Sequence, residues 1–481
     1  MFRSIFNTFG NCAKIPELKS RILFTLGVLA VVRLIAWIRI PGLNGTVLSN
    51  YYATHSQGGG MLGMYNTFAG GALEHCGMGT LGIMPYISAT IIIQLLTAVW
   101  PKLSKLAREE GGRTKIIQYG RYLTVLLCLG QGLFFAIGWE NPEKLFPGIG
   151  QPLVFDLNHI WWYRIQSVLI MTTATMLLMW LGEQITERGI GNGISLIITV
   201  GILARLPQAV TGVVDMFHPS GSSEGHANYG ILIVMVLLLV GVVAGVIAVT
   251  QAQRKIPVQY AQRAVGRKMY QGGTSFMPLK VNYAGVMPII FAQSILMFPQ
   301  PILVGLGNYF SQPFLKGLFT GAAQMLNTGS PTYLTVYALM ILFFSYFWVA
   351  TQFNEIQIAD DLKKNGGYIP GVRPGQGTSD YLHRAMSRIT LAGAIFLTVI
   401  ATIPIILSHE LNIPYAVASF FGGTSVLIAV GVLLDTMRQI ESHLLMRHYD
   451  GFLKKGRGRT NIFDPSLPES KPIHLRVILF V

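Results

Sequence analysis

"YGILIVMVLLLVGVVAGVIAVTQAQRKIPVQYAQRAVGRK", residues 229–268, begins as an uncharged apolar run and ends as a basic segment. Residues 229–250 contain no Asp, Glu, Lys or Arg, and about 20 apolar residues of helix are needed to cross the hydrocarbon core of a bilayer. The Lys and Arg residues that follow must lie in water or among lipid headgroups. The stretch therefore predicts a membrane-spanning helix followed by a basic loop.

The same pattern recurs along the whole chain. The sequence is 51% hydrophobic and only 12% charged, whereas an ordinary soluble protein has about 25% charged residues. We therefore predict an all-α polytopic membrane protein with ten transmembrane helices. The expected spans are residues 21–40, 80–99, 121–139, 164–182, 191–205, 229–250, 282–306, 333–351, 389–408 and 415–434.

The positions of Lys and Arg test this count and orient the chain. Twenty-nine of the 36 Lys and Arg residues lie in the two tails and the even-numbered loops, and the odd-numbered loops hold only Lys144 and Lys316. Because cytoplasmic loops are rich in Lys and Arg, both termini and the even-numbered loops are expected in the cytoplasm. The net charge of +15 would then suit anionic lipid, nucleic acid or acidic proteins.

Ten spans divide into two sets of five, and an odd number in each half makes the second half inverted relative to the first. Inverted halves around a central path are a known membrane architecture, although no internal sequence repeat is evident here. We expect an N-terminal half of residues 1–211 and a C-terminal half of residues 212–437 around a central pore. A cytoplasmic tail, residues 438–481, follows.

Ionisable groups inside the expected spans are few. None of the ten contains Asp or Glu, whereas transporters usually keep an intramembrane carboxylate or His for ion coupling. This argues against an ion-coupled solute carrier. Arg33 lies in the middle of the first span; it is either a functional charge or, more simply, an arginine that faces the bundle or extends to the interface.

Enzyme and metal motifs are not found in the sequence. It has no HExxH, P-loop or GxSxG pattern, and "GIGNGI", residues 189–194, lies between two expected spans rather than after a strand. Cys12, Cys76 and Cys128 are far apart and form no CxxC pair. We therefore predict no catalytic activity, no cofactor and no metal. Three classes of function stay as alternatives: a conduit, a solute carrier, and a scaffold without a pore.

A glycine-rich segment between the first two expected spans breaks the pattern. Residues 61–73 are weakly apolar and too short to cross the bilayer, and glycines flank them on both sides. The segment is either a surface helix or a re-entrant piece, which survives at membrane depth only where protein buries it or where it lines a cavity. A short mobile helix in a pore mouth would have this pattern.

Two long even-numbered loops, residues 251–281 and 352–388, are the other irregular regions. The second contains "GYIPGVRPGQGTSDYLHR", residues 367–384, which we expect to be neither helix nor strand because of its prolines and glycines. A basic rim for anionic lipid explains the charge but not the prolines. A stiff loop with Arg373 at its tip better suits docking of a large macromolecule.

Five long motifs follow one another along the chain. They are "GGALEHCGMGTLGIMPYISATIIIQLL" (70–96), "GEQITERGIGNGISLII" (182–198), "PLKVNYAGVMPIIFAQSI" (278–295), "GYIPGVRPG" (367–375) and "FFGGTSVLIAVGVLLD" (420–435). Read in this order, they resemble the SecY family, whose members form the channel of the bacterial protein translocon. The likeness covers residues 15–458, nearly the whole chain.

The resemblance implies a channel that opens across the membrane and sideways into lipid, sealed by an aliphatic ring and a plug. Isoleucines are common in membrane helices, so the residues alone would not have selected the ring. The implied isoleucine ring is Ile83, Ile87, Ile194, Ile198, Ile290 and Ile428. The implied plug segment is residues 61–73, centred on Met64, Tyr65, Asn66, Thr67 and Phe68. The implied lateral gate lies between spans two and seven, with Ser88, Gln94, Gln131 and Ser294 at the seam.

The resemblance also implies partners, since a chain without a nucleotide site must take its energy from elsewhere. They are the SecE and SecG subunits, the SecA motor ATPase, the ribosome through its RNA, polypeptides that carry a signal sequence, and anionic lipids of the bacterial cytoplasmic membrane. The implied docking residues are Arg373, Arg254, Lys255, Arg263, Arg267 and Lys268. The pair Gln262–Arg263 replaces two adjacent basic residues that are common in the family, and the apolar end, residues 471–481, matches no family pattern.

Overall fold

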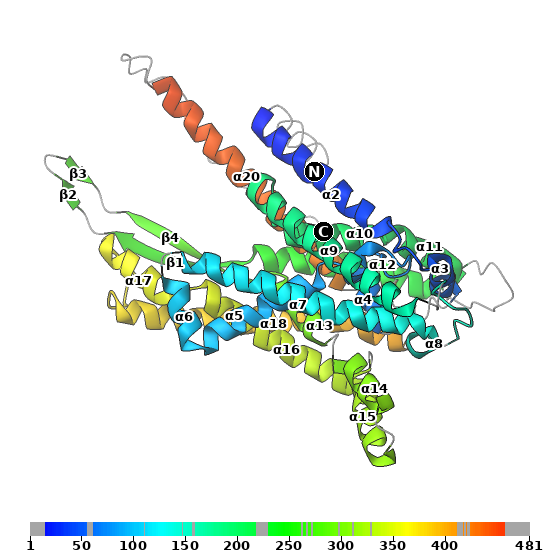
Figure 1. Ribbon diagram of the computed structural model, residues 1–481. Coiled ribbons are helices and arrows are strands. Elements are labelled where there is room, and N and C mark those ends of the chain that lie inside the picture. The colour runs from blue at the N-terminus through cyan, green and yellow to red at the C-terminus, as the bar shows by residue number, and fades with distance from the viewer. Residues whose placement is uncertain are drawn as a thin grey trace. The chain divides into compact units, whose positions relative to one another are not determined.

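The computed structural model describes residues 15–54, 61–109, 111–146, 148–155, 159–217, 229–260, 263–265, 268–270, 273–296, 299–309, 312–327, 330–410, 417, 420 and 424–456. The chain divides into two compact units, Met1–Thr436 and Met437–Val481. The first unit contains the helical bundle shown in Figure 1. The described part of the second unit continues the last helix, α20 (Thr424–Gly456).

The N-terminal half of the chain is helical throughout its regular elements. Several helices begin at a proline, which tolerates the first helical turn because its missing N–H has no partner there. The elements are α2 (Pro16–Trp37), α3 (Gly45–Thr54), α4 (Met61–Phe68), η1 (Met78–Leu81), α5 (Met84–Val99), α6 (Pro101–Arg108), α7 (Gly112–Glu140), α8 (Pro142–Leu145), α9 (Ile160–Arg188), α10 (Gly193–Leu203) and α11 (Leu206–Phe217).

The C-terminal half combines helices with two small antiparallel sheets. The helices are α12 (Tyr229–Gln251), α13 (Met287–Leu296), α14 (Pro299–Tyr309), α15 (Pro313–Met325), α16 (Pro331–Gln352), α17 (Glu355–Lys364), α18 (Gln376–Glu410) and α20. The strands are β1 (Gln253–Tyr260), β2 (Arg263–Val265), β3 (Lys268–Tyr270), β4 (Thr274–Lys280) and β5 (Gly367–Tyr368).

Eight helical segments in the described part of the chain are long and apolar enough to cross a membrane. They match expected spans one to six, eight and nine. The eight segments are Pro16–Trp37, Met78–Val99, Gly112–Glu140, Ile160–Arg188, Gly193–Val214, Leu232–Gln251, Pro331–Lys364 and Gln376–Ile403. The two remaining expected spans correspond to α13 with α14, and to the first part of α20.

Two expected boundaries differ from the structure, and a third falls outside the described residues. The seventh span, predicted as one helix, is divided into α13 and α14, with Pro299 and Pro301 at the start of the second piece, because proline does not continue a helix from the preceding turn. The fifth span does not end at Arg205, since α11 extends the apolar stretch to Val214. The expected start of the tenth span, residues 415–423, lies almost wholly outside the described residues.

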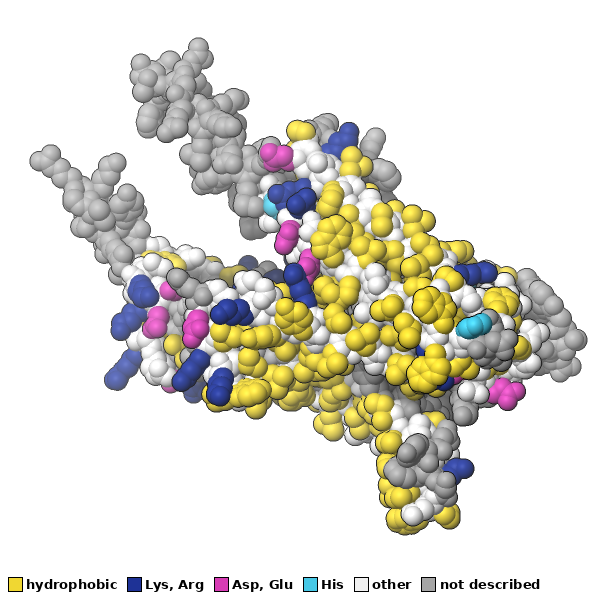
Figure 2. Space-filling model, in the orientation of Figure 1, with side chains coloured by type: hydrophobic (Ala, Val, Ile, Leu, Met, Phe, Trp, Pro, Cys, Tyr) yellow, Lys and Arg dark blue, Asp and Glu magenta, His cyan; other side chains and the backbone are white. Residues whose placement is uncertain are grey.

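The bundle places its apolar side chains both inside and outside. One hydrophobic cluster joins helices from both halves, including α2, α5, α10, α13, α16 and α20. Figure 2 shows hydrophobic side chains also covering the outside of the bundle; Leu126 on α7, for example, is 66% exposed. An apolar outer surface of this extent is expected where lipid, not water, surrounds the helices.

The loop of residues 251–281 folds as a β-hairpin, which the sequence analysis did not predict. Strand β1 pairs with β4 along its length and with β5 at its far end, through Gln259 opposite Tyr368 and Tyr260 opposite Gly367. The expectation that residues 367–384 form neither strand nor helix is therefore wrong at both ends. Its first two residues are β5, and its last nine residues begin α18 at Gln376.

Candidate functional site

The segment after α3 enters the bundle instead of lying on its surface. Tyr65, Asn66 and Phe68 of α4 are buried, and the Tyr65 ring packs 5.0 Å, centroid to centroid, from Phe135 of α7. Leu73, at the end of the following turn, is fully buried. Of the two sequence alternatives, the surface helix is therefore wrong, and protein encloses this irregular backbone.

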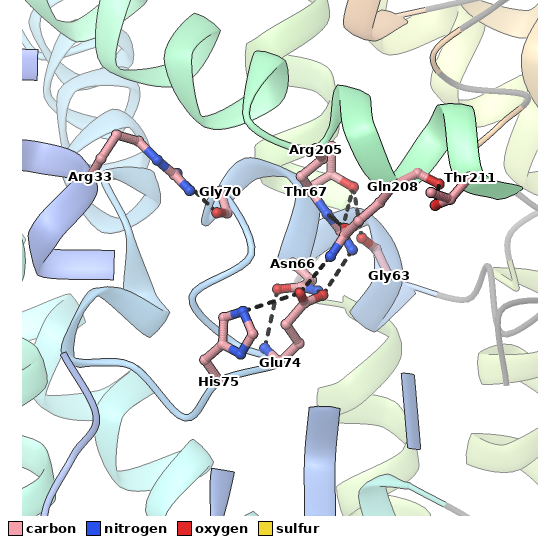
Figure 3. A network of polar contacts seen from close by, with 10 residues as sticks. All are labelled: Arg33, Gly63, Asn66, Thr67, Gly70, Glu74, His75, Arg205, Gln208 and Thr211. Carbon is pink, nitrogen blue, oxygen red and sulfur yellow. Dashed lines mark hydrogen bonds and ion pairs between the residues drawn. The ribbon is translucent and has the colours of Figure 1, made fainter. Parts of the chain in front are cut away.

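The carboxylate of Glu74 forms the centre of a polar network at the end of that segment (Figure 3). Its Oε2 accepts hydrogen bonds from Arg205 Nη2 at 3.0 Å and from Asn66 Nδ2 at 2.9 Å. Its Oε1 accepts one from Gln208 Nε2 at 2.8 Å, and His75 Nε2 lies 3.4 Å away. Glu74 is only 5% exposed, so these donors replace the water that a buried carboxylate would lose.

Two side chains of α2, Arg33 and Trp37, provide further contacts from outside the segment. Arg33 of α2 donates a hydrogen bond from Nη1 to the carbonyl of Gly70 at 2.9 Å, as Figure 3 shows. Arg33 thus faces the bundle, as the simpler sequence interpretation held, but its partner is the buried turn. Trp37, at the end of α2, stacks on His75 with ring centroids 5.0 Å apart.

The turn also contacts α10 directly, through two glycines. A Cβ added at Gly201 of α10 would lie 3.3 Å from the Cα of Gly70, and one added at Gly70 would lie 3.0 Å from the Cα of Gly201. Gly70 has φ of +65°, a conformation that side chains disfavour. Glycine at both positions is what lets the two backbones meet.

The six residues of the isoleucine ring share one hydrophobic cluster. Ile83, Ile87, Ile198, Ile290 and Ile428 are buried in it, and Ile194 packs against it. They come from the start of α5, from α10, α13 and α20, so the fold brings both halves of the chain to this cluster. The cluster holds many other apolar residues, and membership in it does not single out a ring.

The expected lateral gate coincides with a contact between α5 and α13. Ser294 Oγ of α13 lies 4.0 Å from Met84 Sδ of α5, but its closer hydrogen bond, at 2.7 Å, is to Ile290 O within its own helix. Ser88 Oγ, Gln94 Oε1 and Gln131 Oε1 have no hydrogen-bond partner among the described residues. The seam is therefore held mainly by apolar packing.

The expected docking residues lie on the sheet and the turn beside it. Arg254 and Lys255 on β1 are exposed, and so is Arg373 in the turn between β5 and α18. Ile256 and Val258 of β1 are buried and join a second hydrophobic cluster with Ile369 and Leu382. Arg263 and Lys268 belong to β2 and β3, with side chains outside the description, and Arg267 lies outside the described residues.

Figure 2 shows Lys and Arg side chains gathered at the end of the bundle where Figure 1 places β1, β4 and α17. We call the exposed residues of β1, which include Arg254 and Lys255, together with the exposed residues of the turn 370–375 the basic sheet surface. Gly371 and Gly375 in this turn have φ of +82° and +91°. Glycine adopts positive φ readily, so these two residues permit the turn around Arg373.

Sequence reasoning missed four polar residues that the fold places in these regions. Glu74, Arg205 and Gln208 form the network around the buried segment, and Gln293 on α13 is buried with its Oε1 unpartnered among the described residues. The available signal was an arginine, Arg205, at the end of the fifth expected span and a carboxylate, Glu74, directly after the short glycine-flanked segment. Within the described residues, no group of His, Cys, Asp or Glu could hold a metal ion.

Comparison with known proteins assigns this arrangement to a family. Residues 78–437 match the SecY family model. The protein translocase subunit SecY of Chlamydia trachomatis is 43% identical over 453 residues, which cover 92% of this chain and 97% of that protein.

Solved structures share the fold at lower identity. One describes how the plug domain of the SecY protein stabilises the closed state of the translocation channel and maintains a membrane seal; it has a TM-score of 0.55 and 19% identity, covering 88% of this chain and 91% of that one. Sec61 in the canine ribosome-channel complex from the endoplasmic reticulum has a TM-score of 0.53 and 17% identity over 88% of this chain and 91% of that one. From the family model, the relative and the shared fold together, we conclude that the chain belongs to the SecY family of translocation channels.

Proposed function

We propose that the chain is the channel subunit of a bacterial protein translocon. In this role it is a passive conduit: unfolded preproteins cross the membrane through it, and apolar segments leave it sideways into lipid. The observation that carries the proposal is the plug segment, a sub-span piece of backbone buried among membrane helices of a SecY-family chain. A scaffold without a pore would have no need of such a segment.

The plug segment and the isoleucine ring form the seal of the resting channel. Apolar constrictions stop ions by expelling water, yet flexible side chains can deform around a passing polypeptide. Support comes from the burial of Tyr65, Asn66 and Phe68 in α4, and from the common cluster that contains the ring residues. Met64 has the same proposed role, although its side chain lies outside the description.

The lateral gate is the seam between α5 and α13. Ser88 and Gln94 on α5, Gln131 on α7 and Ser294 on α13 are its polar residues. Interhelical polar contacts in membranes contribute only about 0.6 kcal/mol on average, and the unpartnered Ser88, Gln94 and Gln131 oxygens would contribute less still. A seam with so few polar contacts across it suits helices that must separate and close again.

The basic sheet surface binds the partner that supplies energy. Arg373, Arg254 and Lys255 are exposed there, and Arg263, Arg267 and Lys268 extend the same loop. Their charge suits acidic groups of the SecA motor or the phosphates of ribosomal RNA. SecE and SecG are the proposed neighbours within the membrane, with anionic lipid around the basic rim.

Both termini and the basic sheet surface face the cytoplasm in this proposal, in a multi-pass protein of the bacterial cytoplasmic membrane. The two halves, residues 1–211 and 212–437, enclose the path, and residues 438–481 form a cytoplasmic tail. The distribution of Lys and Arg supports this orientation. Reporter fusions test it, because a fusion at Glu224 must report from outside the cytoplasm.

Reconstitution tests the function as a whole. The chain is placed in proteoliposomes with SecE and SecG, and SecA, ATP and a preprotein with a signal sequence are added outside. We expect the preprotein to become protected from protease inside the vesicles, and only when all components are present. Absence of protection in vesicles where the chain is correctly inserted would show that it is not the conduit.

A further inference from the structure

We propose that the Glu74–Arg205 ion pair is a latch that fixes the plug segment to span five and so sets how readily the channel opens. This inference rests on the proposed function, since it concerns the regulation of the same channel. It is carried by the network around Glu74 and by the place in the fold from which Arg205 reaches it (Figure 3).

Arg205 lies at a break in the fifth span. Helix α10 ends at Leu203 and α11 begins at Leu206, so Arg205 lies in the short turn that joins the two helices. It makes two contacts there: Nη1 donates to Thr67 Oγ1 of the plug segment at 3.1 Å, and Nη2 donates at 3.0 Å to Oε2 of Glu74, the residue directly after that segment. One guanidinium therefore holds α4 and the end of the following turn together.

Gln208 aligns the two charged groups. Its Oε1 accepts a hydrogen bond from Arg205 Nε at 3.0 Å, and its Nε2 donates to Glu74 Oε1 at 2.8 Å. Asn66 completes the network from the plug side by donating to Glu74 Oε2. Both oxygens of the carboxylate and three nitrogens of the guanidinium thus have partners, which is the condition for a buried ion pair to be favourable.

The energetics of such a pair suit a latch. With the plug in place, the two charges attract in surroundings of low polarity, where the attraction is stronger than in water. When the plug leaves, both groups can be hydrated, so that opening does not strand a bare charge. Removing only one partner leaves the other charge buried without its ion pair. This destabilises the closed position of the plug relative to the displaced one.

The latch and the isoleucine ring share a helix. Ile194 and Ile198 lie on α10, the same helix whose Gly201 touches Gly70 and whose end carries Arg205. A polypeptide that pushes the ring residues of α10 apart would move the anchor of the plug as well. The structure thus gives a direct physical link between the seal at the ring and the hold on the plug.

Two conservative substitutions test the latch, Glu74→Gln and Arg205→Gln, alone and together. In planar bilayers we expect each single variant to raise the resting ion conductance by about tenfold, as for the loss of a charge-assisted hydrogen bond. Export of a precursor with a defective signal sequence should rise in parallel. The double variant should be no leakier than the worse single variant, because interacting residues are not additive.

A matched control is available in the same protein. Arg164 of α9 and Glu140 of α7 form a bidentate ion pair, at 2.6 Å and 2.7 Å, that does not touch the plug segment. Glu140→Gln and Arg164→Gln should leave conductance and export of the defective precursor unchanged. Thr67→Val removes the neutral acceptor of Arg205, and with it the hydroxyl's own hydrogen bond to Gly63 O at 3.0 Å, but preserves the volume of the side chain. It should give a smaller rise in the same direction.

The outcomes separate the latch from the function on which it rests. Additive effects of Glu74→Gln and Arg205→Gln, or an equal leak in the Glu140→Gln control, would reject the latch. The latch would also be rejected if both single variants and Thr67→Val kept the resting conductance of the unmodified protein while deletion of residues 61–73 raised it. If that deletion leaves the conductance unchanged, the plug role itself fails, and the latch fails with it.

Discussion

The hydroxyl of Tyr368 donates a hydrogen bond to Oε1 of Gln259 at 2.9 Å, although 109 residues separate the two in sequence. The contact joins β5 to β1, and with it the turn of Arg373 to the strand that carries Arg254 and Lys255. Two loops that the sequence presents as separate are thus one surface. This relationship is why Arg373 is expected to act together with the hairpin.

Arg373→Glu should cripple motor-driven translocation while membrane insertion and abundance stay near normal. The substitution removes a charge-assisted contact and places a negative charge opposite the acidic groups of the partner. Docking should therefore weaken by about tenfold or more. Higher salt should weaken docking of the unmodified protein and reduce its difference from Arg373→Glu, because screening weakens electrostatic contacts. The rate of translocation into vesicles is the measurement. Lys102→Glu on α6 is the control, because it makes the same charge change at another position. Normal rates for Arg373→Glu would remove the docking role.

Gly371→Ala should also weaken docking, without changing any charge. A Cβ at Gly371 meets no atom within 4 Å, so the substitution causes no steric clash. Its free-energy cost comes from the backbone φ of +82° and amounts to about 1–2 kcal/mol. The turn should relax and move Arg373. Motor affinity measured on vesicles checks this, with Gly273→Ala as the control, since that glycine has equal space and no positive φ. Equal affinities for the two variants would contradict the prediction.

Deletion of residues 61–73 should raise ion leak several-fold in reconstituted membranes. The deletion removes the buried helix α4 and the contact of Gly70 with Arg33, so only the isoleucine ring would remain to exclude ions. Conductance in planar bilayers is the measurement. Unchanged conductance, with expression intact, would mean that the segment does not plug the channel.

Ile428→Asn should loosen the seal and increase export of precursors with defective signal sequences. Ile428 is fully buried, and an amide there would attract water into an apolar constriction. Leu433→Asn on the same helix is the control, because Leu433 is 49% exposed. If both variants export the defective precursor equally well, Ile428 does not lie at the waist of the channel.

Gly201→Ala should displace the plug segment by steric contact alone. The new Cβ would lie 3.3 Å from the Cα of Gly70, closer than packed backbones usually allow, and the cost of such overpacking is typically 1–3 kcal/mol. We expect a higher resting conductance. Gly130→Ala on α7 is the control and should leave conductance unchanged, because a Cβ there meets nothing within 4 Å. Equal conductance in the two variants would contradict the role of the contact between Gly201 and Gly70.

The sequence by itself determined the membrane class of the protein, most of its spans and its family. Hydropathy is local: residues 229–250 read as a span because each side chain must avoid water, and α12 covers them. The long motifs at Gly70–Leu96 and Gly182–Ile198 were sufficient to recognise the SecY family, because motifs of this length rarely occur outside one family. The division of the seventh span into α13 and α14 was within reach, since Pro299 and Pro301 lie inside the predicted run.

Only the tertiary structure decided which polar residues meet. Glu74 and Arg205 are 131 positions apart, and neither hydropathy nor periodicity relates residues at such a separation. The pairing follows from packing, because α4 enters the bundle beside α10 and a buried carboxylate must find a donor. The pairing of β5 with β1 has the same origin: Gly367 and Tyr368 are too short a segment to be recognised as a strand in the sequence, and they become one because β1 offers an unpaired edge.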